Sequence, residues 1–478
     1  MNMLYKSTRG GEEVSLKQAV LQGPAKDGGL FVPEKFPHLS WQDWVNLSYK
    51  EVAKKVLSLF FDEEWDLTTI LNAYDDKFPE EVVKLRKAEA GTILELFHGP
   101  TAAFKDMALA LLPGFLSQGA AKEGKRVRVL TATSGDTGKA ALEGFRDIPG
   151  TEIAVFYPHG GVSPVQALQM QTQEGGNVKV YGVHGNFDHA QRGVKEILND
   201  EKLRERMAGK NLIFSSANSI NIGRLLPQIV YYVYGYLGMV KNGEIQAREK
   251  IHVSVPTGNF GNILAAYYAK QMGLPIDKLI AVSNDNRVLT DFFKQGNYDA
   301  NRPLILTSSP SMDILISSNL ERLLYHLSAE DTALIQKVMR DLKEKGRYNW
   351  KLENCGEFIS YSFGERECGQ WIKKLWEQNI LSDPHSALAY GGANKYKEEH
   401  RDDRKILIAA TASPFKFPQK VLESLGQSAP KDPWAQLTLL EELSGLSMPK
   451  PIEELKKKKL LHREVIEPEE MKKAVEYD

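Results

Sequence analysis

Two kinds of hydrophobic pattern alternate along the middle of the chain. Strand-like runs occupy residues 126–132, 152–157, 178–183, 251–255 and 279–282. Between them, helical spacing of apolar residues predicts helices over 104–121, 137–146, 165–173, 188–199, 224–240 and 262–272. This alternation predicts an α/β fold with a largely parallel sheet. Because ligands bind such sheets beyond the carboxyl ends of the strands, chemistry is expected at the strand-to-helix turns.

The flanking segments are organised differently. Residues 1–90 predict an N-terminal unit with helices over 15–21, 41–61 and 66–77 and a turn into a short strand at 27–33. Residues 286–365 are less regular, with helices expected at 313–325 and 330–345, and we interpret them as an insertion or lid. The α/β pattern resumes with a strand at 405–410, so that the main region spans 91–425 and a helical tail spans 426–478.

Composition narrows the function classes. The 478 residues include 61 Lys plus Arg and 62 Asp plus Glu, and this balance argues against a nucleic-acid binder. Cys355 and Cys368 form no CxxC pair, so neither a zinc site nor a disulfide framework is expected, and no other metal site is predicted. The polar start lacks a signal-peptide core, and no apolar stretch reaches membrane-spanning length. These features predict a cytoplasmic protein.

One lysine stands in an unusual context. The sequence His-Gly-Pro-Thr-Ala-Ala-Phe-Lys-Asp at 98–106 follows a strand-like run at 93–97, and Lys105 falls in the first turn of the predicted helix, beside its apolar stripe. Residue type alone favours a solvated surface charge. Partial desolvation, however, lowers the pKa of a lysine and makes its amine a better nucleophile for Schiff-base chemistry.

This motif closely resembles the cofactor-lysine motif of threonine synthases, which are pyridoxal-phosphate (PLP) enzymes of the tryptophan-synthase-like superfamily. The openings Tyr-Lys-Ser-Thr-Arg-Gly at 5–10 and Asp-Gly-Gly-Leu at 27–30 are similar to the N-terminus of the same family. The resemblance implies an α/β PLP-dependent fold of type II, like the tryptophan synthase β subunit, with an added N-terminal domain. It also implies that Lys105 holds PLP as a Schiff base.

Two further segments resemble cofactor-binding parts of the family. A turn with two glycines at 256–262 follows a strand and opens a helix, where backbone N–H groups bind phosphate, although any tight turn can use two glycines. The resemblance implies that Gly258, Asn259, Phe260 and Asn262 cradle the PLP phosphate. In Thr-Ala-Ser-Pro at 411–414 the resemblance implies that Thr411 bonds the pyridine nitrogen, and a serine stands where the family often has histidine.

Two segments resemble the family's substrate site. Thr-Ser-Gly-Asp-Thr-Gly at 133–138 implies that Ser134, Asp136 and Thr137 receive the amino-acid part of the substrate, with a helix cap by Ser134 or Asp136 as the alternative. The carboxylate of Asp136 would repel an anion unless it points away. Segment 216–224 implies substrate-phosphate binding, and a surface arginine is the alternative for Arg224. The candidates in this segment are Asn218, Asn221 and Arg224.

The resemblance implies that O-phospho-L-homoserine and water are converted to L-threonine and phosphate, by γ-elimination and β-hydration. It implies a small-molecule substrate, no nucleic-acid or membrane partner, and a monomer or homodimer. Asp-Pro-His at 383–385 predicts a helix N-cap, with His385 as an active-site neighbour. The alternatives are a serine/threonine dehydratase, a threonine-synthase-like phospholyase, and a non-catalytic sensor of a phosphate ligand.

Overall fold

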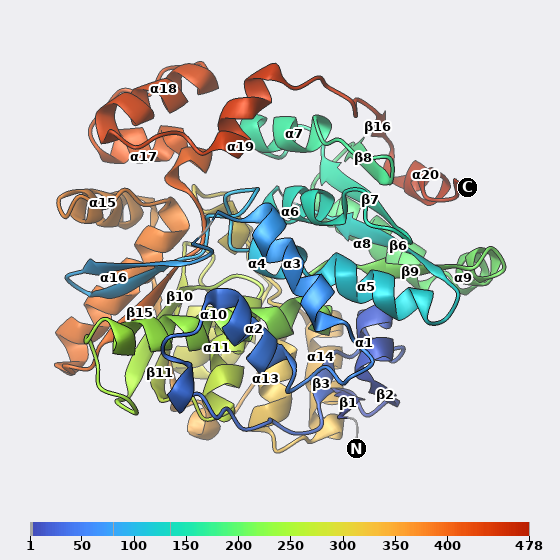
Figure 1. The fold of residues 1–478 in the computed structure, drawn as a ribbon, viewed down its shortest axis with the longest axis horizontal. Coiled ribbons are helices and arrows are strands. Elements are labelled where there is room, and N and C mark those ends of the chain that lie inside the picture. The colour runs from blue at the N-terminus through green and yellow to red at the C-terminus, as the bar shows by residue number, and fades with distance from the viewer. Residues whose placement is uncertain (1–2, 80, 134, 478) are drawn as a thin grey trace.

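The computed structural model describes residues 3–79, 81–133 and 135–477, and two large sheets form its framework (Figure 1). The first sheet has the order β16-β8-β7-β6-β9, and its neighbouring strands are parallel. These strands are β6 (Arg126–Ala132), β7 (Thr151–Pro158), β8 (Val178–Val183), β9 (Leu212–Ser216) and β16 (Val465–Ile466). The predicted strands at 126–132 and 178–183 are confirmed to the residue.

The second sheet has the order β14-β11-β10-β15-β5-β4, in which only the β4–β5 pair is antiparallel. Every residue of β10 and β15 is buried, as expected when helices cover both faces of a parallel sheet. The strands are β4 (Lys84–Ala88), β5 (Gly91–Glu95), β10 (Ile251–Pro256), β11 (Ile276–Ser283), β14 (Phe358–Ser362) and β15 (Ile406–Ala410). The predicted largely parallel α/β architecture is confirmed.

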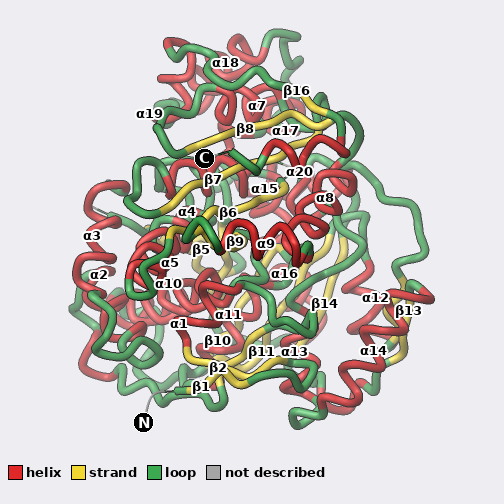
Figure 2. Tube along the Cα trace, turned by 90° about the vertical axis from the view of Figure 1, so that its right-hand side faces the viewer, coloured by secondary structure: helices red, strands yellow, loops and turns green. Residues whose placement is uncertain are grey.

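Helices pack on both sides of the sheets, and Figure 2 shows them in red beside the yellow strands. The longest described helix, α10 (Ile222–Lys241), is buried over most of its length and packs against α2 and α11. The others of this region are α4 (Asp106–Leu109), α5 (Leu112–Ala121), α6 (Asp136–Phe145), α7 (Pro164–Gln171), α8 (Phe187–Asn199), α9 (Glu201–Ala208), α11 (Gly261–Gln271), α12 (Val288–Gln295), α15 (Glu365–Trp376), α16 (Pro384–His400) and α17 (Pro418–Ser424).

The helix predicted over 104–121 is divided into α4 and α5. Pro113 lies in the first turn of α5. Proline has no N–H to donate to the carbonyl four residues earlier, here that of Leu109, and its ring clashes with that carbonyl. A helix therefore ends at Leu109 and a new one begins, which leaves Lys105 at the N-cap of a short helix.

The N-terminal module, residues 3–79, contains a small antiparallel sheet with the order β2-β1-β3. Of the helix predicted over 41–61, only residues 49–57 are α-helical, because a Ser48–Glu51 capping box starts the helix there. The elements are β1 (Leu4–Ser7), β2 (Glu13–Ser15), α1 (Leu16–Gln22), β3 (Phe31–Pro33), α2 (Tyr49–Leu57) and α3 (Leu67–Lys77). The buried side chains of this module are continuous with the main hydrophobic core.

The insertion is narrower than the predicted 286–365. Strand β14 pairs with β11 inside the second sheet, so residues 358–362 belong to the framework. The segment that leaves the framework is bounded by the antiparallel pair β12 (Asn297–Asp299) and β13 (Arg347–Asn349), and we call residues 297–349 the excursion. It carries α13 (Leu320–Leu327) and α14 (Thr332–Lys345), and residues 313–319, predicted as helix, form a turn and loop.

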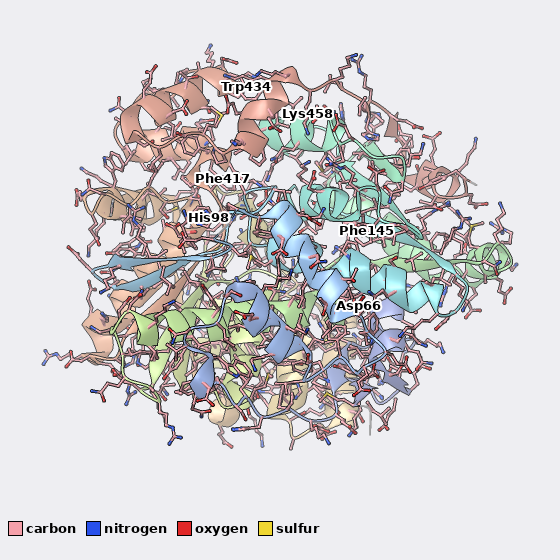
Figure 3. All side chains as sticks on the ribbon, in the orientation of Figure 1. Asp66, His98, Phe145, Phe417, Trp434 and Lys458 are labelled. Atoms are coloured by element: carbon pink, nitrogen blue, oxygen red, sulfur yellow. The ribbon has the colours of Figure 1, made fainter. Side chains whose placement is uncertain are left out.

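The tail is not purely helical, because it adds β16 to the edge of β8. It also contains α18 (Pro433–Ser444), α19 (Lys450–Glu453) and α20 (Met471–Ala474). The fully buried Arg128 holds the end of the tail in place. Its guanidinium donates to the Val475 carbonyl at 2.5 Å and lies 3.7 Å from the ring centroid of Tyr477. Lys456 lies over Trp434, which Figure 3 labels, at 5.0 Å. Among the described residues, no helix is both long and apolar enough to cross a membrane.

Candidate active site

The carboxyl ends of strands from both sheets open on one cavity. Ala132 ends β6, Ser216 ends β9, Pro256 ends β10, and Thr411 directly follows β15; all four line this space of about 1620 Å³. Lys105 lines it as well. The structure therefore brings the predicted segments together where ligands of parallel α/β sheets bind.

The loop that carries Lys105 is fastened to the segment after β15. The N–H of Phe104 donates to the Thr411 carbonyl at 2.8 Å, and the N–H of Ser413 donates to the Ala102 carbonyl at 3.0 Å. Ser413, which replaces the family's histidine, accepts from the N–H of Phe415 and so caps the following short helix. The position of Lys105 is thus set by residues some 300 positions away in the sequence.

The environment of Lys105 suits a nucleophilic amine. Its Nζ donates to Ser311 Oγ at 3.2 Å. Burial lowers the pKa of Lys105 to about 8, the nearby Asp136 carboxylate opposes this, and Arg224 and Lys416 add to it. Because an ordinary lysine has a pKa of ~10.4, a much larger fraction of this amine is neutral at physiological pH.

Asp136 is committed to partners inside the protein. Lys416 Nζ lies 2.7 Å from its carboxylate, and Gln166 Nε2 donates to it at 3.0 Å. Burial raises the pKa of Asp136, but Lys416 and Lys105 outweigh burial and hold that pKa well below its usual range. Gly135, not Asp136, is the N-cap of α6, and Ser134 lies outside the described residues. Thr137 is half-buried and lines the cavity.

The glycine loop, residues 256–262, has the geometry of an anion cradle. A Cβ on Gly258 would lie 2.4 Å from the Ser311 carbonyl oxygen, so only glycine fits there. Phe260 adopts a φ of 63° at the N-cap of α11. Among the described residues, the N–H groups of Gly258, Asn259 and Phe260 have no backbone or side-chain acceptor. Free N–H groups at a helix start are what a phosphate requires.

Asn262 points to the same ligand. Its Oδ1 accepts from the hydroxyls of Tyr231, at 2.8 Å, and Tyr232. Its Nδ2 is buried and has no acceptor in the part of the chain that the structure describes. An unsatisfied buried donor costs about 1–3 kcal/mol unless a ligand pairs with it. Lys105, the three free N–H groups and the Asn262 amide therefore fit the aldehyde and phosphate of PLP.

Replacing Tyr232 by phenylalanine is expected to raise the dissociation constant of PLP about 5–10-fold, because the Asn262 amide loses one of the two bonds that orient it. Titration of the apoprotein with PLP measures this. Tyr236→Phe is the matched control on the same helix, since its hydroxyl donates to the Glu249 carbonyl instead. Equal PLP affinities for the two variants would contradict the assignment.

Thr411 offers a hydroxyl to the cavity. Its N–H donates to Ser386 Oγ at 2.9 Å, and its side-chain hydroxyl has no partner among the described residues. The residue is only 6% exposed. A neutral hydroxyl placed here can bond a pyridine nitrogen without holding it protonated.

The predicted phosphate-binding residues divide into two kinds. Asn221 uses its whole amide inside the protein, since Nδ2 donates to the carbonyls of Val20 and Ser216 and Oδ1 accepts from the N–H of Gly223. Arg224 is buried rather than on the surface; its Nη1 donates to the Ala217 carbonyl at 2.9 Å, and its Nε has no acceptor among the described residues.

Arg224 and Asn218 both line the cavity. Burial lowers the pKa of Arg224 to about 10, so its guanidinium still carries a charge at neutral pH. We therefore expect Asn221 to shape the loop, while Arg224 and Asn218 face a ligand.

Several residues around the site carried no signal in the local sequence pattern. Arg322 is fully buried, and its guanidinium donates to the Phe31 carbonyl at 2.9 Å, the Ile220 carbonyl at 2.6 Å and the Asn319 side chain. Asn319 in turn donates to the Asn259 carbonyl at 2.9 Å. Through these bonds, Arg322 joins the N-terminal module to the Arg224 segment and, by way of Asn319, to the glycine loop. Ser311 and Lys416 were missed for the same reason: their partners are distant in the sequence.

Comparison with known proteins gives consistent matches. A family model described as "Threonine synthase N terminus" matches residues 4–75, and one described as "Pyridoxal-phosphate dependent enzyme" matches residues 93–412. Threonine synthase of Eremothecium gossypii is 36% identical over 89% of this chain and 90% of its own length. Threonine synthase-like 1 of Homo sapiens is 38% identical over 87% of this chain and 59% of its own.

Solved structures agree. The crystal structure of PLP-bound threonine synthase from Brucella melitensis has a TM-score of 0.86 and 33% identity, with 100% of both chains covered. The matches cover the N-terminal module as well as both sheets, and the site fits PLP. The chain therefore belongs to the threonine synthase family of PLP-dependent enzymes.

Proposed function

We propose that the enzyme converts O-phospho-L-homoserine and water to L-threonine and phosphate. The observation that carries this proposal is a second group of donors in the cofactor cavity: Arg224 Nε has no acceptor among the described residues, and Asn218, whose Nδ2 also donates to the Ala132 carbonyl at 3.3 Å, lies beside it. The glycine loop and Asn262 suit the phosphate of PLP, whereas Arg224 and Asn218 lie on a different segment and still face the cavity. A substrate that itself carries a phosphate has a use for this second group.

Each residue has a defined part in the proposed reaction. PLP, when bound, supplies the electron sink for the substrate's carbon centres. Lys105 is the group that moves protons, because a pKa lowered to about 8 lets its amine both release and accept a proton near neutral pH. Arg224 and Asn218 hold the leaving phosphate, Ser134 and Thr137 receive the amino-acid part, and Asp136, paired with Lys416, fixes that loop. The excursion forms one wall of the site and is the candidate for the element that controls entry of water.

Arg224→Ala is expected to raise KM for O-phospho-L-homoserine about 100-fold or more, because a buried guanidinium bonded to phosphate is worth about 3 kcal/mol. The absorbance of the lysine-bound cofactor should stay unchanged. Steady-state phosphate release measures the effect, and Arg126→Ala, which removes an exposed arginine paired with Glu152, serves as the control. Unchanged KM in Arg224→Ala would remove the residue from the phosphate site.

A single incubation with O-phospho-L-homoserine tests the proposed function. Equal amounts of threonine and phosphate support it. Phosphate with 2-oxobutyrate and no threonine would instead mean a phospholyase. Neither product, from protein loaded with PLP, would overturn the proposed substrate and favour a dehydratase or a sensor of a phosphate ligand.

We also propose that the enzyme works in the cytoplasm as a monomer or homodimer. Both cysteines are free and buried, which suits a reducing compartment. Light scattering of the purified enzyme measures its assembly, and fractionation of the source cells its location.

A further inference from the structure

A turn of the excursion is held rigidly against the carboxyl end of β11. The Asp313 carboxylate accepts from the side chains of Asn284, at 2.7 Å, and Asn286, at 3.0 Å. It also accepts from the N–H of Thr307 at 2.9 Å and from the Thr307 hydroxyl at 2.7 Å. These four bonds close residues 307–313 into a fixed turn, and Ser311 lies within it.

Both backbone groups of Ser311 are engaged by the site. Its carbonyl oxygen packs so closely on Gly258 that a Cβ there would lie 2.4 Å away. Its N–H donates to His385 Nε2 at 3.3 Å, and His385 Nδ1, which must then carry the ring proton, donates to Asp383 at 2.8 Å. The backbone is therefore held from two sides, and the position of the Ser311 side chain is constrained.

The Ser311 hydroxyl contacts the reacting amine. Lys105 Nζ donates to Oγ at 3.2 Å, and the hydroxyl proton itself has no acceptor among the described residues. Ser311 lines the same cavity as Lys105 and Thr411. A hydroxyl that accepts from an amine and keeps its own proton available can pass a proton between that amine and a third atom.

We propose that Ser311 is a catalytic residue that relays protons between Lys105 and the substrate. One proton moves from Lys105 Nζ to Ser311 Oγ while the hydroxyl proton moves from Oγ to the substrate atom, so one proton is transferred in total and the serine is unchanged. This inference rests on the proposed function, which requires protons to be moved at more than one carbon. A relay lets one amine serve two atoms without moving its whole side chain.

Two variants of the same turn test the relay. Ser311→Ala removes the hydroxyl, Ser311→Thr keeps it, and Ser308→Ala is the control, since the Ser308 hydroxyl donates to Glu365 instead. We expect Ser311→Ala to lower kcat about 10–100-fold with KM changed less than about threefold, and Ser311→Thr to restore most of kcat. In mixtures of light and heavy water, the dependence of kcat should indicate two protons in flight in the wild type and one in Ser311→Ala. A kcat and proton count in Ser311→Ala equal to those of Ser308→Ala would overturn the proposal.

A second readout does not depend on turnover. In the apoprotein, the rate of Lys105 acetylation against pH, followed by peptide mass spectrometry, reports the state of the amine. Asp136 on α6, Asp106 on α4, Arg224 on α10 and Lys416 after β15 face this amine and remain in every variant. Ser311→Ala should move the midpoint down by roughly 0.5 to 1 pH unit, because a hydrogen-bond acceptor for the ammonium is lost.

An unmoved midpoint would mean that Ser311 does not touch the amine, whatever the substrate. If the wild type makes no threonine but the midpoint moves, the contact stands, while the proposed substrate fails and the relay fails with it.

Discussion

Lys105→Ala will lose turnover by about 10³–10⁴-fold or more and will lose the visible absorbance of lysine-bound PLP. The amine is the only side chain among the predicted site residues that can both form a Schiff base and move a proton. Its loss leaves the free N–H groups of the glycine loop and the Asn262 amide in place. PLP should therefore still bind, noncovalently and with lower affinity. Absorbance spectra and product assays on the purified variant measure both effects.

The control is Lys50→Ala, which removes a surface lysine paired with Asp75. It should keep both the absorbance and the activity. A Lys105→Ala protein that retains even a tenth of the wild-type rate would rule out Lys105 as the group that moves protons.

Lys416→Met will destabilise the protein by about 3–5 kcal/mol, because it leaves the buried Asp136 carboxylate without its cation. Urea unfolding measures this as a lower midpoint. The double variant Lys416→Met/Asp136→Asn should recover much of the loss, since it removes both charges together. With Asp136→Asn as the other single variant, stability losses that add up to that of the double variant would show that the pair contributes no coupling.

The Lys416→Met substitution is also expected to change the pKa of Lys105. Lys416 lowers the pKa of Lys105, and the Asp136 carboxylate raises it. Burial and Arg224 still lower the pKa of Lys105 when Lys416 is absent, but one of the charges that oppose the carboxylate is gone, so this pKa should rise above its value of about 8. The amine is then protonated at higher pH, and its acetylation midpoint in the apoprotein should move up. A midpoint that falls would contradict the arrangement of these three charges.

Elements that a local pattern determines could be predicted from the sequence. Strands β6 and β8 are short segments in which apolar residues predominate, and they begin and end where expected. The prediction of one helix over 104–121 was wrong at Pro113. The proline removes a backbone hydrogen bond and clashes with the preceding turn, and this outweighs the amphipathic spacing around it. The helix predicted over 313–325 begins only at Leu320, because the Asp313 carboxylate closes a turn with Asn284, 29 residues earlier.

The site residues also fall into two groups, those that a local motif predicts and those that only the fold brings together. Lys105, Gly258 and Arg224 stand in contiguous motifs at strand-to-helix turns, and the structure brings them to one cavity. Lys416, Ser311 and Tyr232 act through tertiary contacts: Lys105 meets Ser311 across 206 residues, and Lys416 meets the Thr101 carbonyl across 315. No periodicity in the chain marks such residues, because the fold alone makes them neighbours.

The strand order of the six-stranded sheet determines how late in synthesis β5 can pair with its neighbour β15. Strand β5 pairs with β15, which follows it by about 310 residues. At the ~5–20 residues per second of a ribosome, β5 waits about 15–60 s for that partner. An unpaired edge templates association with other chains. We therefore expect the nascent polypeptide to be most prone to association until residue 410 has left the exit tunnel. A ribosome that stalls after β5 and before β15 leaves this edge open to aggregation.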